Sequence, residues 1–439
     1  MRTRSALAAV LIGALVLVAA AAARNVQSTG PTKLTVWAGW SAGHELTTFK
    51  QIVAEYDRKH PEVEIKVVGG IDDNKIVAAI RSGTAPDVVS SFNSYNVGNY
   101  CGSGGWIDLG PLLKKDHIDP SMFPPAPRYY TQYEGKRCAL PLLADDYGLY
   151  YNKDLFAKAG IKSPPRTVSE LAADAKKLTV RDSKGNIKIA GFDPVVGFYE
   201  NTPDRWIQQF GGKWVDSKGH SLIGKDPQWA KWATWQKQLV DWYGYDKLVR
   251  FQSQPMDEFT PSQAFETGKL AMNFDGEWRV AFIHNEHPDL DYGTAPMPVD
   301  DAHPELYGSG YINGTIIGIP RGVKHQTEAW ALVKYLTTAD HPLAVLSNGL
   351  RNVPTTTSSL HSKEIVPDAH FATFLKIFAN PKSSTSPILA SGQAYSNAVQ
   401  HFFQQYQAGN GKNLAGGLNK LAKQLDAQVA QAKGGGGVP

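Results

Sequence analysis

Apolar and polar residues follow strand and helix spacing in turn between residues 33 and 90. Three short segments rich in β-branched residues predict strands, at 33–38, 63–68 and 87–90. Between them, apolar residues recur every three or four positions over 44–59 and 74–82, which predicts two helices. This β-α-β-α-β order predicts a parallel, doubly wound sheet, and such sheets bind ligands at the carboxyl ends of their strands.

The remainder of the chain combines extended segments with helices. Extended segments are predicted at 138–151, 267–275, 291–297 and 315–319. Helical spacing predicts helices at 168–178, 227–243, 327–336, 342–347, 371–377, 393–406 and 414–432. The helix at 227–243 has Asp226 as its N-cap and Pro227 at its first position. Its apolar stripe is interpreted as packing in the core or between lobes, in preference to a ligand platform: Trp229, Trp232, Trp235, Leu239 and Trp242.

The first 23 residues have the pattern of an export signal. Arg2 and Arg4 precede an unbroken apolar run over 6–23, which ends in Ala21-Ala22-Ala23 and fits a small-residue cleavage site. We therefore expect an exported protein that resides in the periplasm or at the extracytoplasmic cell surface. A retained membrane anchor is the alternative, because the run approaches a spanning length. The glycine-rich end, 434–439, is predicted to be a flexible tail.

Length and composition indicate a globular protein of two domains. A chain of 439 residues exceeds one ordinary core, and 42% hydrophobic with 20% charged residues is a globular composition. The formal charge of +4 includes no run of basic residues, so nucleic-acid binding is not supported. Export would place Cys101 and Cys138 in an oxidising compartment, which predicts a disulfide between them; two free thiols are the alternative.

The sequence lacks the motifs of common catalytic and metal sites. It contains no GxSxG nucleophile elbow, no phosphate-binding loop and no HExxH zinc motif. The closely spaced pair His284 and His287 stands beside a proline and is interpreted as a polar helix end rather than a metal site. We therefore predict no metal, no cofactor and no enzymatic activity.

Several segments together carry a family resemblance. They occur in one order over nearly the whole chain after the leader: LTVWAGW, FKQIVAEYDRKHPEVEIKVV, SGTAPDVV, LPLLADDYGLYYNKDLFAKAGI, PPRTVSELAADAKKL, FETGKLAMNFDGEW, YGTAPMP and GYINGTIIGIP. The chain resembles the extracellular solute-binding proteins of ATP-driven (ABC) importers, in the carbohydrate-binding group that includes maltose- and glycerol-phosphate-binding proteins. No single segment decides the resemblance, but the ordered set is specific.

The resemblance implies a periplasmic-binding-protein fold, with two doubly wound α/β lobes joined by a hinge and the ligand cleft between them. Three chain crossings are expected, near 141–147, 294–312 and 337–341. The first lobe would comprise 33–143 plus 312–338, and the second 144–300 plus 341–433. Such a protein would capture a sugar by hinge closure and deliver it to the permease subunits of an importer, and it is expected to be a monomer.

The resemblance also implies ligand-binding residues in the second lobe and at the hinge. A sugar has apolar C–H faces and a rim of hydroxyls, so aromatic rings and carboxylate acceptors suit it without catalysis. In the DGEW segment, Trp278 would stack on the sugar, and Asp275 or Glu277 would accept from hydroxyls. Asp145 corresponds to a hinge-proximal acid of the family. The lesser candidates are Tyr147 next to that acid, Trp206 on a second-lobe loop and Tyr395 on a late helix.

The predicted sheet and nearby loops supply further candidates. Trp40, Ser41 and His44 follow the first strand, and Ser91 and Asn93 follow the third, so these side chains would face the cleft. The loop after the third strand often carries a large aromatic or charged residue in the family. Here it reads SSFNSY, so the contact would be weaker or differently made, which leaves the sugar size open. Two more candidates are Gly310, whose backbone amide could approach the ligand, and Arg351, as a hydroxyl or phosphate ligand.

Three alternatives remain open from the sequence. An exported glycosidase could use Asp145 with Glu277, or Asp275 with Glu277, as its two carboxylates. The same fold could bind a glycerol-phosphate ligand through Arg351, His44 and glycine amides, although the nearby acids would repel a dianion. A sensor or surface adhesin could also reuse the fold.

Overall fold

The computed structural model describes residues 30–41 and 43–434. The predicted export signal and the residues 435–439 of the predicted tail lie outside this part of the chain. Within it the strands are β1 Thr32–Trp37, β2 Val63–Val68, β3 Val88–Ser91, β4 Leu140–Asn152, β5 Val180–Arg181, β6 Ile187–Ile189, β7 Met272–Gly276, β8 Tyr292–Pro296 and β9 Ile312–Gly318.

The α-helices occur throughout the described chain. They are α1 Gly43–Lys59, α2 Asp73–Ser82, α3 Val97–Gly102, α4 Gly110–Lys115, α5 Pro125–Tyr130, α6 Lys153–Lys158, α7 Val168–Leu178, α8 Pro203–Trp206, α9 Pro227–Tyr243, α10 Tyr245–Gln252, α11 Arg279–Glu286, α12 Gln326–Thr338, α13 Asp340–Leu350, α14 Phe371–Ala379, α15 Gln393–Gln407 and α16 Leu414–Gly434. Short 3₁₀ turns lie at Ser94–Asn96, Pro120–Met122, Ile207–Phe210, Pro304–Leu306 and Ser359–His361.

The first lobe has the parallel sheet that the sequence predicts. β1 pairs in parallel with β2 and β3, and β9 joins β3 in the antiparallel sense. Its helices begin and end at recognisable residues: Asp72 accepts a hydrogen bond from the amide of Lys75 at the start of α2, and Gly83 ends α2 in the left-handed conformation. The carboxyl ends of β1 and β3 therefore lie side by side, as expected for a ligand site.

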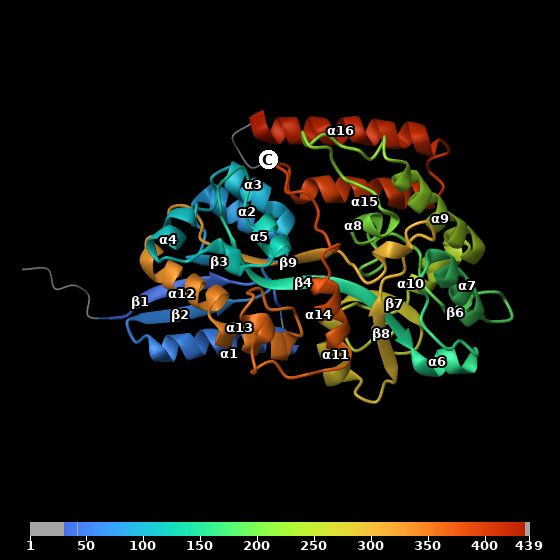
Figure 1. Ribbon diagram of the computed structural model, residues 1–439, viewed down its shortest axis with the longest axis horizontal. Helices are drawn as coiled ribbons and strands as arrows, with labels where there is room; N and C mark the ends of the chain where they lie inside the picture. Colours follow the sequence, from blue (N-terminus) through green and yellow to red (C-terminus); the bar gives the residue numbers. More distant parts are fainter. Residues whose placement is uncertain (1–29, 42, 435–439) are drawn as a thin grey trace, which may run out of the picture.

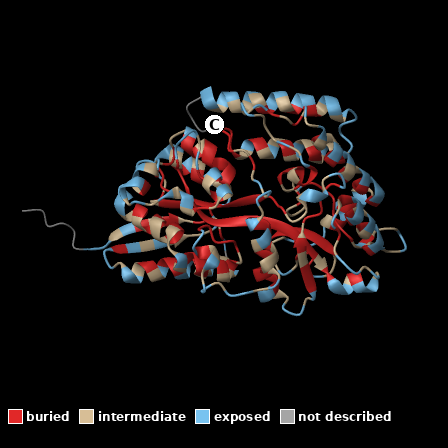
Figure 2. Cartoon of the chain, in the orientation of Figure 1, coloured by how far each residue is buried: buried red, intermediate tan, exposed pale blue. Residues whose placement is uncertain are grey.

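β4 serves both lobes. Its first half pairs with β9, through residues 140–146, and its second half pairs with β7 and β8, through residues 147–152. The strand is buried almost throughout, and Figures 1 and 2 show it running from one lobe into the other. All of its pairings are antiparallel, so the parallel pattern is confined to β2, β1 and β3 among the described strands.

The second lobe is mainly helical around β7 and β8. Trp229 and Trp232 of α9 are fully buried, which confirms their predicted core packing, whereas Trp242 at the end of α9 is 40% exposed. α16 packs along α15 on the outer side of this lobe (Figure 1). The strand predicted at 267–275 begins only at Met272, because residues 265–269 form turns.

α13 packs in the first lobe, which corrects one predicted boundary. The link between α12 and α13 at Ala339 does not carry the chain into the second lobe, because α13 contacts α1. Leu346 and Leu350 of α13 belong to the same buried cluster as Leu34 and Phe49. The predicted crossing at 337–341 and the start of the second lobe at 341 are therefore wrong, and the chain leaves the first lobe only after α13.

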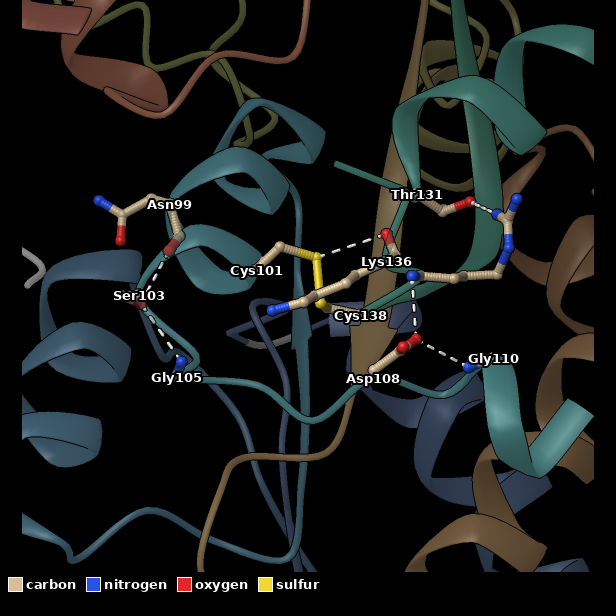
Figure 3. Close-up of a disulfide and its surroundings, with 10 residues drawn as sticks. Asn99, Cys101, Ser103, Gly105, Asp108, Gly110, Thr131, Lys136 and Cys138 are labelled. Carbon is tan, nitrogen blue, oxygen red and sulfur yellow. Dashed lines mark hydrogen bonds between the residues drawn. A yellow bond between two sulfur atoms is a disulfide. The ribbon is translucent and has the colours of Figure 1, made fainter. Parts of the chain in front are cut away.

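Cys101 of α3 and Cys138 before β4 form a disulfide, as predicted, with their Cα atoms 5.5 Å apart (Figure 3). The bond joins two segments of the first lobe that are 37 residues apart in sequence. No helix among residues 30–41 and 43–434 is both long and apolar enough to span a membrane.

Candidate ligand-binding site

A cavity of about 400 Å³ lies between the two lobes. Its floor includes Asp145 and Tyr147 of β4 and Asn313 and Thr315 of β9, the two strands that pair where the lobes meet. The remaining lining residues come from both lobes: Gly39, Trp40, Ser41, Gly43, His44, Glu45, Phe92, Asn93, Glu200, Arg205, Phe259, Trp278, Phe282, Glu286 and Asn352.

Trp40 forms the aromatic wall of the first lobe. It follows β1, and its ring packs 5.0 Å from the ring of Phe49 in α1 and 5.5 Å from Phe92, measured between centroids. Gly39 permits this arrangement, because a Cβ atom there would lie 2.5 Å from the ring of Phe92. The sequence Ala-Gly-Trp after β1 thus fixes two aromatic rings beside the cavity.

Trp278 forms the aromatic wall of the second lobe. Its ring lies edge-on to Tyr147, with centroids 5.6 Å apart. A side chain at Gly276 would overlap the indole of Trp278, so the glycine of the DGEW segment lets the indole fold back over its own strand. The indole Nε1 has no hydrogen-bond partner within the described part of the chain. A buried donor of this kind suits a ligand oxygen.

Asp145, Asn352 and Glu277 form a buried cluster at the hinge. The amide nitrogen of Asn352 donates to Asp145 and to Glu277, at 2.7 Å in each case. Glu277 also accepts from the backbone amide of Asp146 at 2.9 Å. Burial raises the pKa of all three carboxyl groups, those of Asp145, Asp146 and Glu277. Asp145 is the acid of this cluster that lines the cavity.

Arg205 is the one arginine or lysine that lines the cavity within the described residues. Its guanidinium donates to Glu200 at 2.6 Å and to the hydroxyl of Tyr147 at 2.9 Å, and it also pairs with Asp204. Burial alone would lower the pKa of Arg205, but the carboxylates, with Asp204 foremost, raise it well above its usual value. The positive charge is therefore already matched by two neighbouring acids.

His44 and Glu45 bring α1 to the cavity. The ring of His44 lies 4.7 Å from that of Phe282 in α11, so the lobes touch beside the cavity. Burial, with a smaller effect of Arg279, lowers the pKa of His44. Burial raises the pKa of Glu45 to about 7. A neutral imidazole and an uncharged carboxyl can both donate and accept hydrogen bonds.

Comparison with known proteins decides the family. Residues 40–341 match the model of the bacterial extracellular solute-binding proteins. The chain belongs to this family. The predicted resemblance is therefore confirmed, and the cavity of this solute-binding protein occupies the cleft where the fold is expected to hold its ligand.

Individual relatives agree with this assignment. The chain is 23% identical over 342 residues to a maltotriose-binding protein of Pyrococcus abyssi (strain GE5 / Orsay), covering 77% of this chain and 70% of the relative. It is 21% identical over 289 residues to the melibiose/raffinose/stachyose-binding protein of Bacillus subtilis (strain 168), covering 65% of each. The solved structure of CpMnBP1 with mannotriose bound superposes with a TM-score of 0.81 at 26% identity, covering 90% of this chain and all of the other. The predicted periplasmic-binding-protein fold is confirmed.

The structure brings about half of the predicted site residues of the solute-binding protein to the cavity. These are Trp40, Ser41, His44, Asn93, Asp145, Tyr147 and Trp278. The others lie elsewhere: Ser91, Trp206, Asp275, Glu277, Gly310, Arg351 and Tyr395. These seven residues do not line the cavity, and each makes other contacts within the protein.

Asp275 and Glu277 have structural partners. Asp275 is fully buried and pairs with Nε of Arg279 at 2.8 Å, while Arg279 also pairs with Glu266 at 2.9 Å. Asp275 and Arg279 are four residues apart, but they belong to β7 and to the start of α11, so helical spacing could not have indicated this pair. Glu277 is equally buried and reaches the cavity only through Asn352, which lines it.

Trp206 and Tyr395 belong to the core of the second lobe. Trp206 has no exposed surface, and its indole donates to the side chain of Asn201 at 2.6 Å. The hydroxyl of Tyr395 lies 3.0 Å from that of Ser221. Both aromatic rings therefore contribute to packing, which sequence alone does not distinguish from a ligand contact.

Ser91, Gly310 and Arg351 are held by neighbouring groups. The hydroxyl of Ser91 donates to Asp73 at 2.6 Å. The amide of Gly310 donates to the hydroxyl of Ser383 at 3.0 Å. Arg351 donates to the carbonyl of Val366 at 2.9 Å, in an exposed position. None of these three groups reaches the cavity.

The sequence did not indicate Glu200, Arg205, Asn313 or Asn352. Each of these residues lies in a segment without a strong periodic pattern, or at the end of a predicted strand or helix. Each reaches the cavity only because segments far apart in sequence come together there. For example, Asn352 and its partner Asp145 are 207 residues apart. The one local signal is that Glu200 and Asp204 lie within five residues of Arg205, which indicates an ion-pair cluster but not a ligand site.

Proposed function

We propose that this protein binds a carbohydrate between its lobes and delivers it to the membrane subunits of an ATP-driven importer. One observation carries the proposal: a single interlobe cavity combines Trp40 and Trp278 with the carboxylate and amide groups of Asp145, Asn313 and Asn352. Aromatic rings complement the C–H faces of a sugar, and buried acceptors complement its hydroxyls.

Polar atoms at the cavity support a ligand rich in hydroxyl groups. Nε1 of Trp278, Nε2 of His44 and Nε of Arg205 are buried and have no hydrogen-bond partner within residues 30–41 and 43–434. Leaving such groups unpaired costs about 1–3 kcal/mol each. Sugar hydroxyls can accept from the N–H groups of Trp278 and Arg205, can pair with Nε2 of His44 in either tautomer, and can at the same time donate to Asp145.

A phosphate ligand is disfavoured by the charges around the cavity. Asp145, Glu45, Glu200 and Glu286 line it, whereas Arg205 already pairs with Glu200 and Asp204. Arg351, which was the other candidate for a phosphate, donates to a carbonyl outside the cavity. A phosphate would therefore face four carboxyl groups, while the arginine at the cavity is already paired, so a sugar without phosphate suits the site better.

The geometry of the acids does not support glycosidase activity either. Asp145 and Glu277 share the amide of Asn352, and Glu277 lies behind that amide rather than at the cavity. Asp275 is committed to Arg279 in the core. Neither predicted pair of acids thus flanks a position where a scissile bond could lie, and we infer binding without turnover.

The proposal extends to location and partners. The pattern of residues 1–23 and membership of an extracellular family support export to the periplasm or the cell surface, with removal of the leader. We infer that the protein works as a monomer and that the permease recognises its closed form. Contact between His44 of the first lobe and Phe282 of the second supports closure around the ligand.

A thermal-shift screen of the exported protein tests the function. The panel contains mono- and oligosaccharides, polyols and glycerol phosphates, each at low and at high salt. A ligand at 100 times its dissociation constant adds about 2.7 kcal/mol to the free energy of unfolding. We expect a saccharide to raise the melting temperature equally at both salt concentrations, because the interaction is not between net charges. A shift with a glycerol phosphate alone, weakened by salt, would contradict the proposal.

A further inference from the structure

Two phenylalanines are exposed at the cavity, one from each lobe. Phe92, after β3, is 40% exposed, and Phe259, on the loop before β7, is 56% exposed. Phe259 is the most exposed large apolar side chain in the described part of the chain. Exposed apolar surface that continues from a ligand cavity marks an interaction site rather than a packing defect.

Both rings are held in place by their neighbours. The ring of Phe92 lies over the backbone of Gly39, where a Cβ atom would collide with it, and meets the edge of Trp40. The ring of Phe259 lies 5.9 Å from that of Phe282, and the guanidinium of Arg279 lies 5.9 Å from the centroid of Phe259. Two aromatic rings in fixed positions therefore line the cavity and remain partly exposed to solvent.

The cavity itself is small for a long ligand. Its volume of about 400 Å³ lies towards the lower end of the roughly 300 to 1,000 Å³ of small-molecule sites. Buried polar groups are gathered at its floor, where Asp145, Asn313 and Asn352 lie. The polar groups at the floor and the partly exposed rings of Phe92 and Phe259 together suit a chain-like ligand. One end of such a ligand would lie deep in the cavity, and the other would reach its solvent-exposed side.

We propose that the ligand is an oligosaccharide whose outer sugar unit lies at the solvent-exposed side of the cavity, against Phe92 and Phe259. This inference rests on the proposed carbohydrate function and adds a chain-length preference to it. The inner units contact Trp278 and Asp145, and the outer unit presents its C–H faces to the two exposed rings. The continuity of both rings with the cavity favours this occupant over a surface of the permease.

Titration calorimetry with saccharides of increasing length tests the inference. The probes are malto-oligosaccharides and manno-oligosaccharides of two to five units, added to the exported protein and to its Phe92→Ala, Phe259→Ala and double variants. We expect the wild-type affinity to rise about tenfold beyond the disaccharide of the series that binds. The double variant should lose most of this tenfold gain, because stacking on aromatic rings contributes up to about tenfold in affinity. Its affinity for the disaccharide should fall less than threefold.

The matched control is Trp242→Ala. It removes an aromatic side chain that is 40% exposed, as Phe92 is, but that does not line the cavity. It should retain the full gain with chain length. Equal wild-type affinity for all lengths would overturn the inference while leaving the carbohydrate function intact, as would an undiminished gain in the double variant. Unchanged affinities with a loss of importer stimulation would instead assign the two rings to the permease. Failure of every saccharide in these series and in the wider screen would overturn both proposals.

Discussion

The side-chain amide of Asn352 donates a hydrogen bond of 2.7 Å to the carboxylate of Asp145, across 207 residues of sequence. Asn352 follows α13 of the first lobe, whereas Asp145 lies on β4, which continues into the second lobe. The same amide nitrogen also donates to Glu277 at 2.7 Å. Asn352 therefore holds two buried acids together at the hinge and orients the one that lines the cavity.

Replacing this amide by a third carboxyl group should damage the site. We expect Asn352→Asp to weaken saccharide binding at least tenfold and to lower the free energy of unfolding by about 1–3 kcal/mol, because two buried acceptors lose their donor. Calorimetric titration and urea unfolding measure the two effects. Asn348→Asp is the matched control, because Asn348 lies four residues earlier, near the end of α13, and the hydrogen bonds of its side chain are exposed. Equal effects of the two substitutions would refute the role of Asn352.

Trp278 and Trp206 were both predicted to contact the ligand from the second lobe, but substitutions at the two positions should affect binding and stability differently. Trp278→Phe keeps a ring but removes Nε1, so the saccharide affinity should fall about three- to tenfold with a small change in stability. Trp206→Ala empties a fully buried position and should lower the free energy of unfolding by about 3–5 kcal/mol. Calorimetry and urea unfolding of both variants check this. A larger affinity loss in a folded Trp206→Phe variant than in Trp278→Phe would contradict it.

Asp145 and Asp275 should respond in opposite ways to the same chemical change. Asp275→Asn removes one partner of the buried pair with Arg279, which should lower the free energy of unfolding by about 3–5 kcal/mol. Asp145→Asn removes a carboxyl group whose pKa is raised by burial, so stability should hold or rise while saccharide affinity falls. Urea unfolding and calorimetry on both variants provide the comparison. A stability loss in Asp145→Asn that matches Asp275→Asn would show that Asp145 is a structural acid.

Asp193 should make stability depend on pH. Burial raises its pKa from 3.8 to about 7. Between these values the native state keeps a proton that the unfolded state has released, so the free energy of unfolding falls as the pH rises and levels off above about 7. One unit of pKa difference corresponds to about 1.4 kcal/mol, which sets an upper limit of about 4 kcal/mol for this group.

Urea unfolding from pH 4 to pH 8 measures this dependence, which Asp193→Asn should make shallower. Asp241→Asn is the control, because the side chain of Asp241 is 60% exposed in the same lobe. If the wild type and Asp193→Asn show the same slope over this range, the buried carboxyl group of Asp193 does not titrate as inferred.

Local sequence patterns predicted most of the fold. The spacing of apolar residues placed α1, α2 and α9 within one or two residues, because each helix buries one stripe and carries its own end signals. The boundary at 341 failed for a different reason. The apolar face of α13 suits either lobe equally well, and only its contact with α1 decides between them.

The site was predictable only where topology or a local motif places a residue. Trp40 and Asn93 follow parallel strands, and Gly276 leaves room for the indole of Trp278, so these positions have local causes. Asp275 and Glu277 looked like ligand acceptors because their buried partners are not visible in a strand pattern. Asn352 could not be found at all, since its function arises from contacts between segments far apart in sequence.

Calorimetric titration of the saccharide identified by the screen, into the wild type and into Trp278→Ala and Asp145→Asn, tests the central claim most directly. We expect one binding site in the wild type and a loss of at least tenfold in affinity in each variant, with both variants still folded. Wild-type affinity in both variants would show that the ligand binds away from the interlobe cavity, and it would contradict the account.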